Sequence, residues 1–520
     1  MVLNQNCRRI RALRKAICSL PDNGKDTPIF FFNASTRLSG LSQNAGFSLI
    51  SSLALQAYGY PIVHLVCERG LSHCVLGTNN NHPQASPPCA ECVRTSKMIF
   101  SEKEVQAFRF QRDLILETQL ASLDLEKLLA FEKNGFPLGA LVLPSLRWIL
   151  RRHHLEDNVD TRYLAREYML SAWNLKKEAE RLLPLIHPRA VVVFNGMTYP
   201  EAIVRWVARK SGIPVFSHEV GMLPYSAFFT DKDATAYPVT IDSSFALSES
   251  QNKRLDEFLE RRIEGKFVTA GVKFWPEMKS LDAEFIKMAG QFKAVVPIFT
   301  NVVFDTSQAH ANVVFDHMFD WLDTTLEKIK SHPDTLFVIR AHPDELRPGK
   351  ESRESVADWI TARQVDRLPN VVFIPSNKYI SSYDLIKKSK FVMVYNSTIG
   401  LEASILGKPV LCAGRARYTL IPTVFFPPSR AEYQETLLRF LDTEKIENPD
   451  EFRLNARRVL YSQLFRASLP FDQFLEEDGV WQGYVRLKEF SKDELSPEKS
   501  STIQVVLKGI LDQQPFIRDL

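Results

Sequence analysis

Residues 395–410 have the sequence YNSTIGLEASILGKPV, in which an apolar strand ends at a Ser-Thr-x-Gly turn and a helix begins. Ser397 and Thr398 can cap this helix with their hydroxyls, and Gly400 lets the backbone approach a ligand closely. The start of such a helix presents unpaired N–H groups and a positive dipole end, which suit a diphosphate. Glu402 lies one turn into the helix, where it can accept the two hydroxyls of a ribose. An ordinary capped helix, with Glu402 matched to the helix dipole, is the alternative interpretation.

The apolar runs around this stretch alternate with helical patterns, which predicts a parallel, doubly wound sheet. These runs are VVPIFTN (295–301), LFVIRAHP (336–343), VVFIP (371–375), FVMVYNS (391–397) and KPVLCAG (408–414). Ligands bind at the carboxyl ends of strands in such sheets, and polar residues follow four of these runs. The predicted nucleotide site consists of Asn301, Asp305, Arg340, His342, Pro343, Glu345, Ser376, Ser397, Thr398, Gly400 and Glu402.

Arg340 and His342 follow one strand within the sequence RAHP. An Arg and a His at one strand end can neutralise a diphosphate leaving group, and Pro343 stiffens the turn between strand and helix. A lone His is more often structural. Because the Ser-Thr-x-Gly helix follows two strands later at the same sheet edge, the functional interpretation is favoured here.

The first half of the chain contains a second alternation of strands and helices. Its apolar runs are PIFFFN (28–33), YPIVHLV (60–66), AVVVFNG (190–196) and IPVFSHE (213–219). Between the second and third runs, residues 102–186 have long helical periodicities with many charges, which predict a helical insertion. The sequence therefore predicts another parallel sheet in this half.

The predicted domains are residues 1–265, with a Cys-rich loop at 66–95 and the helical insertion at 102–186, then residues 266–435, and a helical segment at 436–520. At 520 residues, the chain is long enough for two domains. The last segment is charged and helical. Its sequence does not decide whether it crosses back to the first domain.

Composition favours a folded protein that does not bind nucleic acid. Hydrophobic residues make up 45% of the chain, and the formal net charge is only +4. No apolar run reaches the roughly 20 residues that span a bilayer. The N-terminal sequence RRIRALRK is basic and amphipathic, which predicts either a helix packed on the first domain or a contact with anionic lipid headgroups. We expect a cytoplasmic protein, at most peripheral at the inner face of the cell membrane.

Four of the seven cysteines lie close together in sequence. Cys67, Cys74, Cys89 and Cys92 form a C-x6-C-x14-C-x2-C pattern. In a reducing compartment, this pattern is compatible with a structural zinc site or an iron-sulfur cluster, with His73 and His82 as substitute ligands. The alternative is free thiols in a long loop. Because four protein ligands leave no open position, any metal here is expected to be structural rather than catalytic.

Several motifs together resemble those of bacterial capsule and surface-polysaccharide glycosyltransferases of GT-B fold. They are V-I-R-A-H-P-x-E (338–345), I-S-S-Y (380–383), Y-N-S-T-I-G-L-E (395–402) and G-K-P-V (407–410). The resemblance covers roughly residues 301–433. It extends to the first half through F-N-G (194–196) and H-E-V-G (218–221).

The resemblance implies an α/β protein of GT-B type, with two Rossmann-like doubly wound domains that face a cleft. The second domain would bind the nucleotide-sugar donor. The first would bind the acceptor through Asn195, Gly196, His218 and Gly221. The catalytic residues would be Glu219, as the base, and His342. Glu219 could instead be a strand-end carboxylate that orients a loop.

The expected activity is transfer of a sugar from a nucleotide sugar to a surface polysaccharide or a lipid-linked glycan. No metal is expected to be required, because no Asp-x-Asp motif follows a predicted strand. The alternatives within the same fold are a CDP-polyol phosphotransferase and a UDP-sugar 2-epimerase. A non-enzymatic alternative is an assembly subunit that binds nucleotide sugars.

Overall fold

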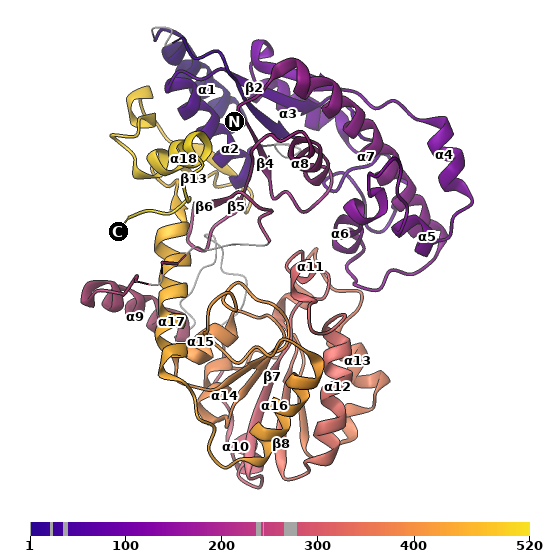
Figure 1. Ribbon diagram of the computed structural model, residues 1–520, viewed down its shortest axis with the longest axis vertical. Helices are drawn as coiled ribbons and strands as arrows, with labels where there is room; N and C mark the ends of the chain where they lie inside the picture. Colours follow the sequence, from indigo (N-terminus) through magenta and orange to yellow (C-terminus); the bar gives the residue numbers. More distant parts are fainter. Residues whose placement is uncertain are drawn as a thin grey trace.

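The computed structural model describes residues 2–20, 24–34, 40–235, 241–242, 244–264 and 278–519. The chain forms two α/β domains, each built around its own sheet (Figure 1). The boundary predicted at residues 265 and 266 lies outside the described residues. Because both domains contain parallel, doubly wound sheets, the predicted GT-B fold class is confirmed.

The sheet of the first domain has seven strands in the order β12-β6-β5-β4-β1-β2-β3. Its strands are β1 (Ile29–Asn33), β2 (Ile62–Cys67), β3 (Val105–Phe108), β4 (Ala190–Phe194), β5 (Val215–Val220), β6 (Ser226–Thr230) and β12 (Leu469–Pro470). Strands β1 to β5 are parallel, whereas β6 and β12 are antiparallel additions at one edge. Strands β1, β2, β4 and β5 match the predicted apolar runs, whereas β3, β6 and β12 were not predicted. Asp231 and Asp233 directly follow β6, so an Asp-x-Asp pattern, found after none of the predicted strands, does occur at a strand end.

Both faces of this sheet are covered, since alternate residues of a buried strand enter opposite cores. Phe31 belongs to one core with α1 (Val2–Cys18), α2 (Gln43–Ala57) and α18 (Ser501–Asp512). Phe30 and Phe32 belong to the other, with α6, α7 and α8. The helices of this second face and of the connecting segments are α3 (Cys89–Ile99), α4 (Leu114–Ala121), α5 (Leu125–Leu129), α6 (Leu138–Leu150), α7 (Val159–Ile186) and α8 (Glu201–Lys210). The predicted insertion is therefore helical, apart from β3 at its start.

The N-terminal helix α1 packs on the first domain. Ile10, Leu13 and Ile17 form its buried stripe in the core, whereas Arg8 and Arg11 are exposed. Because the apolar side is covered by protein, contact with anionic headgroups would have to use the basic side alone.

The end of the chain returns to the first domain, a point that the sequence left open. Helix α17 (Asp450–Tyr461) and the π-helical turn η4 (Ser462–Ala467) lead into β12, which pairs with β6. The hairpin of β13 (Leu475–Glu477) and β14 (Val485–Leu487) then contacts α1 and α2, and α18 lies against α2 (Figure 1). The first domain is thus built from both ends of the sequence.

The sheet of the second domain has five parallel strands in the order β11-β10-β7-β8-β9. They are β7 (Ala294–Phe299), β8 (Thr335–Arg340), β9 (Val371–Ile374), β10 (Val392–Val394) and β11 (Val410–Cys412). The helices of this half are α9 (Glu249–Ile263), α10 (Ala283–Ala289), α11 (Gln308–Ala311), α12 (Met318–Ser331), α13 (Val356–Ala362), α14 (Ser382–Lys388), α15 (Ile399–Ile405) and α16 (Arg430–Asp442). All five strands match the predicted apolar runs.

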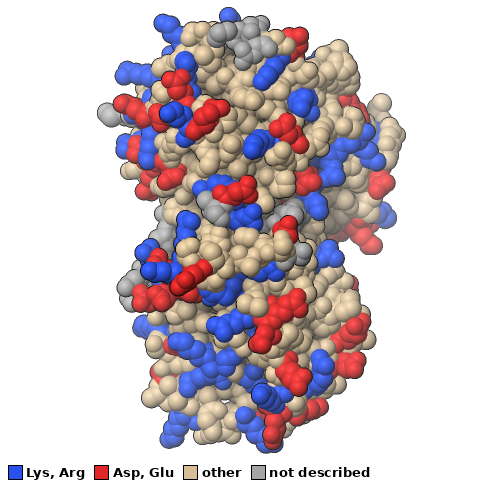
Figure 2. Space-filling model, turned by 60° about the vertical axis from the view of Figure 1, so that its left-hand side comes forward, with Lys and Arg blue, Asp and Glu red and all other residues tan. Residues whose placement is uncertain are grey.

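The loops that follow strands of the two sheets meet at the domain interface. Asp233, which follows β6, forms an ion pair with His310 of α11, and the rings of Trp148 and Phe304 are 5.8 Å apart. Figure 2 shows a surface that narrows between the two halves and carries positive and negative side chains interspersed over both. Within the described ranges, no helix has the length and apolar character needed to cross a membrane.

Candidate functional site

Glu219 lies near the end of β5, on the side of the first domain that faces the second. Its Oε1 accepts hydrogen bonds from Asn44 Nδ2 at 2.8 Å and from the backbone N–H of Val220 at 2.9 Å. Its Oε2 accepts one from Asn195 Nδ2 at 3.0 Å. Burial raises the pKa of Glu219, and these hydrogen bonds offset the rise only in part. Since solvent still reaches part of the side chain, the carboxylate can act as a base toward a bound molecule.

Asn195 links Glu219 to the loop after β4. Its Oδ1 accepts hydrogen bonds from the N–H groups of Met197 at 3.1 Å and Thr198 at 3.3 Å, while its Nδ2 holds Glu219. The next residue, Gly196, has a φ of +75°, and a Cβ there would lie 2.4 Å from Ser217 Oγ. Glycine is therefore required where this loop passes close to β5, and Asn195 connects the loop to the Glu219 carboxylate.

The other two predicted acceptor-side residues, His218 and Gly221, make contacts within the first domain. His218 is fully buried, and its ring packs against Phe229 with the centroids 5.5 Å apart. Burial lowers the pKa of His218 to about 3, so the ring is neutral. The expectation that His218 contacts an acceptor is contradicted, because it alternates with Glu219 along β5 and points into the core. Gly221 begins the turn to β6, and its N–H donates to Ser226 O at 2.7 Å.

Glu201, the first residue of α8, is a second buried carboxylate close to Glu219, and sequence reasoning missed it. Burial raises the pKa of Glu201 to about 8, and the negative charge of Glu219 adds to the rise. The sequence signal was weak, because an acidic residue in a first helical turn normally indicates only a match to the helix dipole.

We expect Glu201→Gln to change the pH dependence of stability. Between pH 4.5 and about 8, folded wild-type protein holds a proton on Glu201 that the unfolded chain has released. Wild-type stability therefore falls as pH rises through this window, whereas the variant lacks the effect. The free energy of unfolding of the variant minus that of wild type should therefore increase with pH, by up to about 1.4 kcal/mol per pH unit.

Urea unfolding at several pH values between 5 and 8 measures this difference. Glu249→Gln is the matched control, because Glu249 occupies the first turn of α9 but is exposed. Parallel pH curves for wild type and Glu201→Gln would show that Glu201 ionises normally.

In the second domain, amide side chains connect the ends of β7 and β10. Asn301 Nδ2 donates to Asn396 Oδ1 at 2.7 Å, and Gln308 Nε2 donates to the same oxygen at 3.2 Å. Asp305 accepts a hydrogen bond from the Ser307 N–H at 2.8 Å and so shapes the loop after β7. The structure therefore brings together the predicted residues Asn301 and Asp305 and the end of β10.

His342 caps the 3-10 turn formed by Pro343–Leu346. Its Nδ1 accepts a hydrogen bond from the Asp344 N–H at 3.1 Å. Burial lowers the pKa of His342, so the ring is neutral and its proton lies on Nε2. An Nε2–H donor at the end of β8 is suited to a phosphate oxygen.

Three of the predicted site residues point into the domain instead. Arg340 is 4% exposed and donates a hydrogen bond to the Ile380 carbonyl. Glu345 is 1% exposed and accepts hydrogen bonds from Ser376 Oγ at 2.8 Å and from the Val356 N–H at 3.1 Å. These contacts join the loops after β8 and β9. They correct the expectation that Arg340, Glu345 and Ser376 bind the ligand directly.

The start of α15 differs from the predicted capped helix. Thr398 occupies the N-cap position in a helical conformation, and its side chain forms no capping hydrogen bond. Among the residues that the structure describes, neither the Ser397 nor the Thr398 hydroxyl has a hydrogen-bond partner. Gly400 is required by close packing, because a Cβ there would lie 2.6 Å from Tyr418 Oη. Both hydroxyls are thus available to a ligand.

Glu402 is 2% exposed, and both of its carboxylate oxygens are occupied. Oε1 accepts a hydrogen bond from Arg262 Nε at 2.6 Å, and Oε2 accepts one from Tyr383 Oη at 2.5 Å. The expectation that Glu402 accepts two ribose hydroxyls is therefore corrected, because the carboxylate ties α15 to α9 and α14.

Sequence reasoning also missed charged residues at the domain interface. Arg417, which follows β11, is exposed and close enough to Glu219 to affect its charge, and it lies over the Phe228 ring at 5.9 Å. Asp233 accepts from His310 Nε2 at 3.0 Å, and Arg205 lies 3.9 Å away. Burial alone would raise the pKa of Asp233, but the hydrogen bonds and these positive groups lower it overall. The GRARY sequence after β11 was the available signal for Arg417, since polar strand ends mark sites.

The cysteine segment contains two similar turns. The N–H of Gly70 donates to Cys67 Sγ, and the N–H of Gly77 donates to Cys74 Sγ, both at 3.2 Å. Burial raises the pKa of each of these two thiols to about 12. Cys89 and Cys92 lie on α3 rather than in the predicted loop. Across the described ranges, no group of three or more His, Cys, Asp or Glu side chains is arranged to hold a metal ion, and metal binding here stays a prediction.

The chain shows similarity to several known proteins. A 103-residue segment, 20% of this chain, is 31% identical to Protein FixF of Sinorhizobium fredii, and the match spans only 22% of that relative's length. The KpsC beta Kdo 2,4 transferase of Thermosulfurimonas dismutans is 13% identical, with 54% of this chain and 80% of that chain covered and a TM-score of 0.34. The KpsC beta Kdo 2,7 transferase of the same organism is 15% identical, with 61% of this chain and 86% of that chain covered and a TM-score of 0.31.

The family comparison concerns the second domain. Residues 275–421 match the family described as "Capsule polysaccharide biosynthesis protein". This range contains all five strands of the second sheet and the polar residues that follow them. The resemblance to capsule polysaccharide biosynthesis proteins inferred from the sequence is therefore confirmed, and residues 275–421 carry it.

Proposed function

We propose that this protein is a glycosyltransferase of capsule polysaccharide biosynthesis that moves a sugar from a nucleotide-sugar donor to a glycan acceptor. The observation that carries the proposal is the position of Glu219. This carboxylate is held by two amide side chains at the end of β5 and lies within electrostatic range of Arg417 from the other domain. A fixed base opposite a cation suits a reaction in which a hydroxyl loses a proton while a diphosphate leaves.

In the proposed reaction, Glu219 accepts the proton of an acceptor hydroxyl. The hydroxyl oxygen forms a bond to the anomeric carbon of the donor sugar, and the bond from that carbon to the diphosphate oxygen breaks. Arg417, the Nε2–H of His342 and the free hydroxyls at the start of α15 would receive the negative charge of the leaving diphosphate. The raised pKa of Glu219 makes it a stronger base than an ordinary glutamate.

A nucleotide panel tests the proposal. The full chain is mixed with UDP, CMP, CDP and their sugars, and its melting temperature is measured, because a ligand that binds only the native state raises it. Donors that bind are then incubated with glycan acceptors. Sugar transfer supports the proposal. Epimerisation of UDP-GlcNAc without an acceptor would favour the 2-epimerase, polyol phosphate transfer would favour the phosphotransferase, and binding without turnover would favour an assembly subunit.

His342→Ala is expected to weaken binding of the nucleotide diphosphate by about tenfold or more, because a hydrogen bond to a charged group is lost. Isothermal titration with the nucleotide that gives the largest thermal shift measures this. The control is His332→Ala, since His332 lies at the end of α12, before β8 rather than after it. Unchanged affinity in His342→Ala would remove this residue from the donor site.

A further inference from the structure

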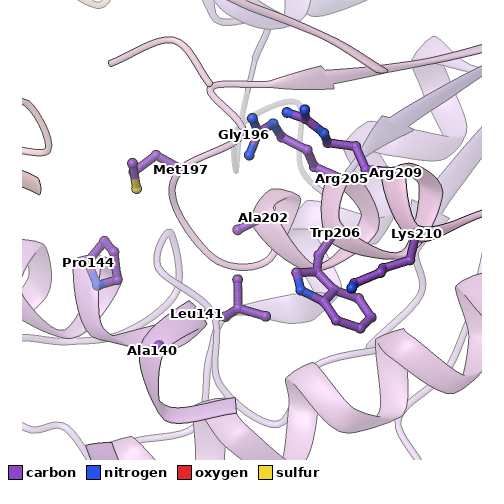
Figure 3. Close-up of a pocket in the computed structure, with 10 residues that line it drawn as sticks. All are labelled: Ala140, Leu141, Pro144, Gly196, Met197, Ala202, Arg205, Trp206, Arg209 and Lys210. Carbon is purple, nitrogen blue, oxygen red and sulfur yellow. The ribbon is translucent and has the colours of Figure 1, made fainter. Parts of the chain in front are cut away.

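A pocket in the first domain lies between α6 and α8, beside the loop that follows β4 (Figure 3). Its volume of about 450 Å³ is within the range of small-molecule sites and can hold one or two sugar rings. The residues that line it are Ala140, Leu141, Pro144, Gly196, Met197, Ala202, Arg205, Trp206, Arg209 and Lys210.

The pocket is next to the proposed base. Gly196, in its wall, directly follows Asn195, whose Nδ2 donates to Glu219 at 3.0 Å. Met197, also in the wall, donates its N–H to the Oδ1 of the same Asn195. The loop that positions the carboxylate therefore also forms one side of the pocket, and a sugar in the pocket would lie on the acceptor side of the domain interface.

One part of the pocket is apolar and rigid. Leu141 and Pro144 come from α6, and Trp206 comes from α8 (Figure 3). The indole of Trp206 packs edge-on against Phe136, with the ring centroids 4.7 Å apart, which fixes its orientation. A fixed aromatic ring provides a flat surface for the apolar side of a pyranose ring.

The other part of the pocket carries three positively charged residues, Arg205, Arg209 and Lys210. Arg209 and Lys210 are exposed, and neither forms an ion pair with any residue that the structure describes. Arg205 has two carboxylates in its surroundings, Asp233 at 3.9 Å and Asp231, and its buried Nε has no hydrogen-bond acceptor within the described ranges.

The positions of these cations leave room for an anion. The guanidinium groups of Arg205 and Arg209 lie near each other, and Lys210 lies over the Trp206 ring at 5.5 Å (Figure 3). Like charges held close together repel, and an anion between them removes the repulsion. Positive residues in the last turn of a helix are also stabilised by the helix dipole, without any ligand. A control variant should therefore remove a similar pair of cations from the last turn of another helix.

We propose that this pocket binds the acceptor sugar and selects one that carries a carboxylate or a phosphate group. The anion pairs with the guanidinium groups of Arg205 and Arg209, the ring packs on Trp206 near Lys210, and a hydroxyl of the same glycan reaches Glu219. This inference rests on the proposed function, because it assigns the acceptor of that reaction.

The test measures binding of three sugars to the full chain by ligand-observed NMR titration. The probes are D-glucuronate, α-D-glucose 1-phosphate and neutral D-glucose. We expect at least one of the two acidic sugars to bind about tenfold more tightly than glucose, as expected for an added charge-assisted contact. Preference for glucuronate identifies an acidic sugar as the acceptor, and preference for the phosphate identifies a phosphorylated one.

Two variants localise the binding. Arg209→Gln/Lys210→Gln should remove the preference, and Ala140→Phe should block the pocket for all three sugars, because Ala140 is an exposed wall residue of α6. Lys387→Gln/Lys388→Gln is the matched control, since this exposed pair also occupies the last turn of a helix, α14, outside the pocket.

The proposal is overturned if neither acidic sugar binds better than glucose, or if the Arg209→Gln/Lys210→Gln variant keeps the preference. Nucleotide thermal shifts measured on the same proteins separate this result from failure of the proposed function. Normal nucleotide binding with no preference for acidic sugars refutes only the pocket. Absence of nucleotide binding in wild type refutes the proposed function, and the sugar titration still reports on the pocket.

Discussion

Glu219→Gln is expected to abolish most sugar transfer while nucleotide-sugar binding stays intact. Loss of a general base typically lowers the rate by about 10²–10⁴-fold. The amide of Gln fits the same space but cannot accept a proton, and the proposed donor site lies in the other domain. The rate of sugar transfer measures the first effect, and the thermal shift with the donor measures the second.

The pH dependence gives an independent readout of the same residue. Because burial raises the pKa of Glu219, transfer by wild type should fall as pH is lowered through a range above that of an ordinary glutamate. Glu68→Gln is the control, since Glu68 follows β2, another strand of the same sheet, and pairs with Lys97 and Arg109. Loss of donor affinity in Glu219→Gln, or transfer at the wild-type rate, would contradict the division of roles between the domains.

The strand pattern of the second domain was predictable because each strand is a short, continuous apolar run. A parallel sheet covered on both faces requires such runs, and the topology then brings their ends to one edge. Asn301 and His342 therefore lie where the sequence indicated. The same logic located Glu219 in the first domain.

Sequence patterns could not show which polar side chains are already occupied. Glu345 and Ser376 follow different strands and bond to each other, so neither presents its polar group to a ligand. His218 and Glu219 are adjacent in sequence, yet the two-residue period of the strand sends one into the core and the other toward the interface.

Contacts between distant parts of the chain were also beyond the sequence. Strand β12 pairs with β6, although more than 200 residues separate them, and no local signal marks so short a strand. The interface pair of Asp233 and His310 depends on how the two domains pack, which residue spacing does not report. The α6–α8 pocket arises in the same way, because its two walls come from elements on either side of α7 and β4.

The second large effect is expected on substitution of Glu402. For this residue, the sequence motif predicts a loss of nucleotide binding, whereas the structure predicts a loss of stability. If Glu402 bound a ribose, Glu402→Gln would weaken nucleotide binding and leave the fold intact. In the structure, its carboxylate is buried and pairs with Arg262, which is 19% exposed. Removing one partner of a buried ion pair leaves the other charge uncompensated. We therefore expect Glu402→Gln to lower the free energy of unfolding by about 3–5 kcal/mol, measured by urea denaturation.

A double variant separates the two roles of Glu402. In Arg262→Met/Glu402→Gln, no unpaired charge remains and the amide oxygen at position 402 can still accept a hydrogen bond from Tyr383, so most of the stability should return. Glu435→Ala is the control for an exposed glutamate on α16 and should change stability little. Nucleotide titration of the stable double variant then decides the function of this position. Wild-type affinity would assign Glu402 to holding α15 against α9 and α14, whereas lost affinity at full stability would restore it to the donor site.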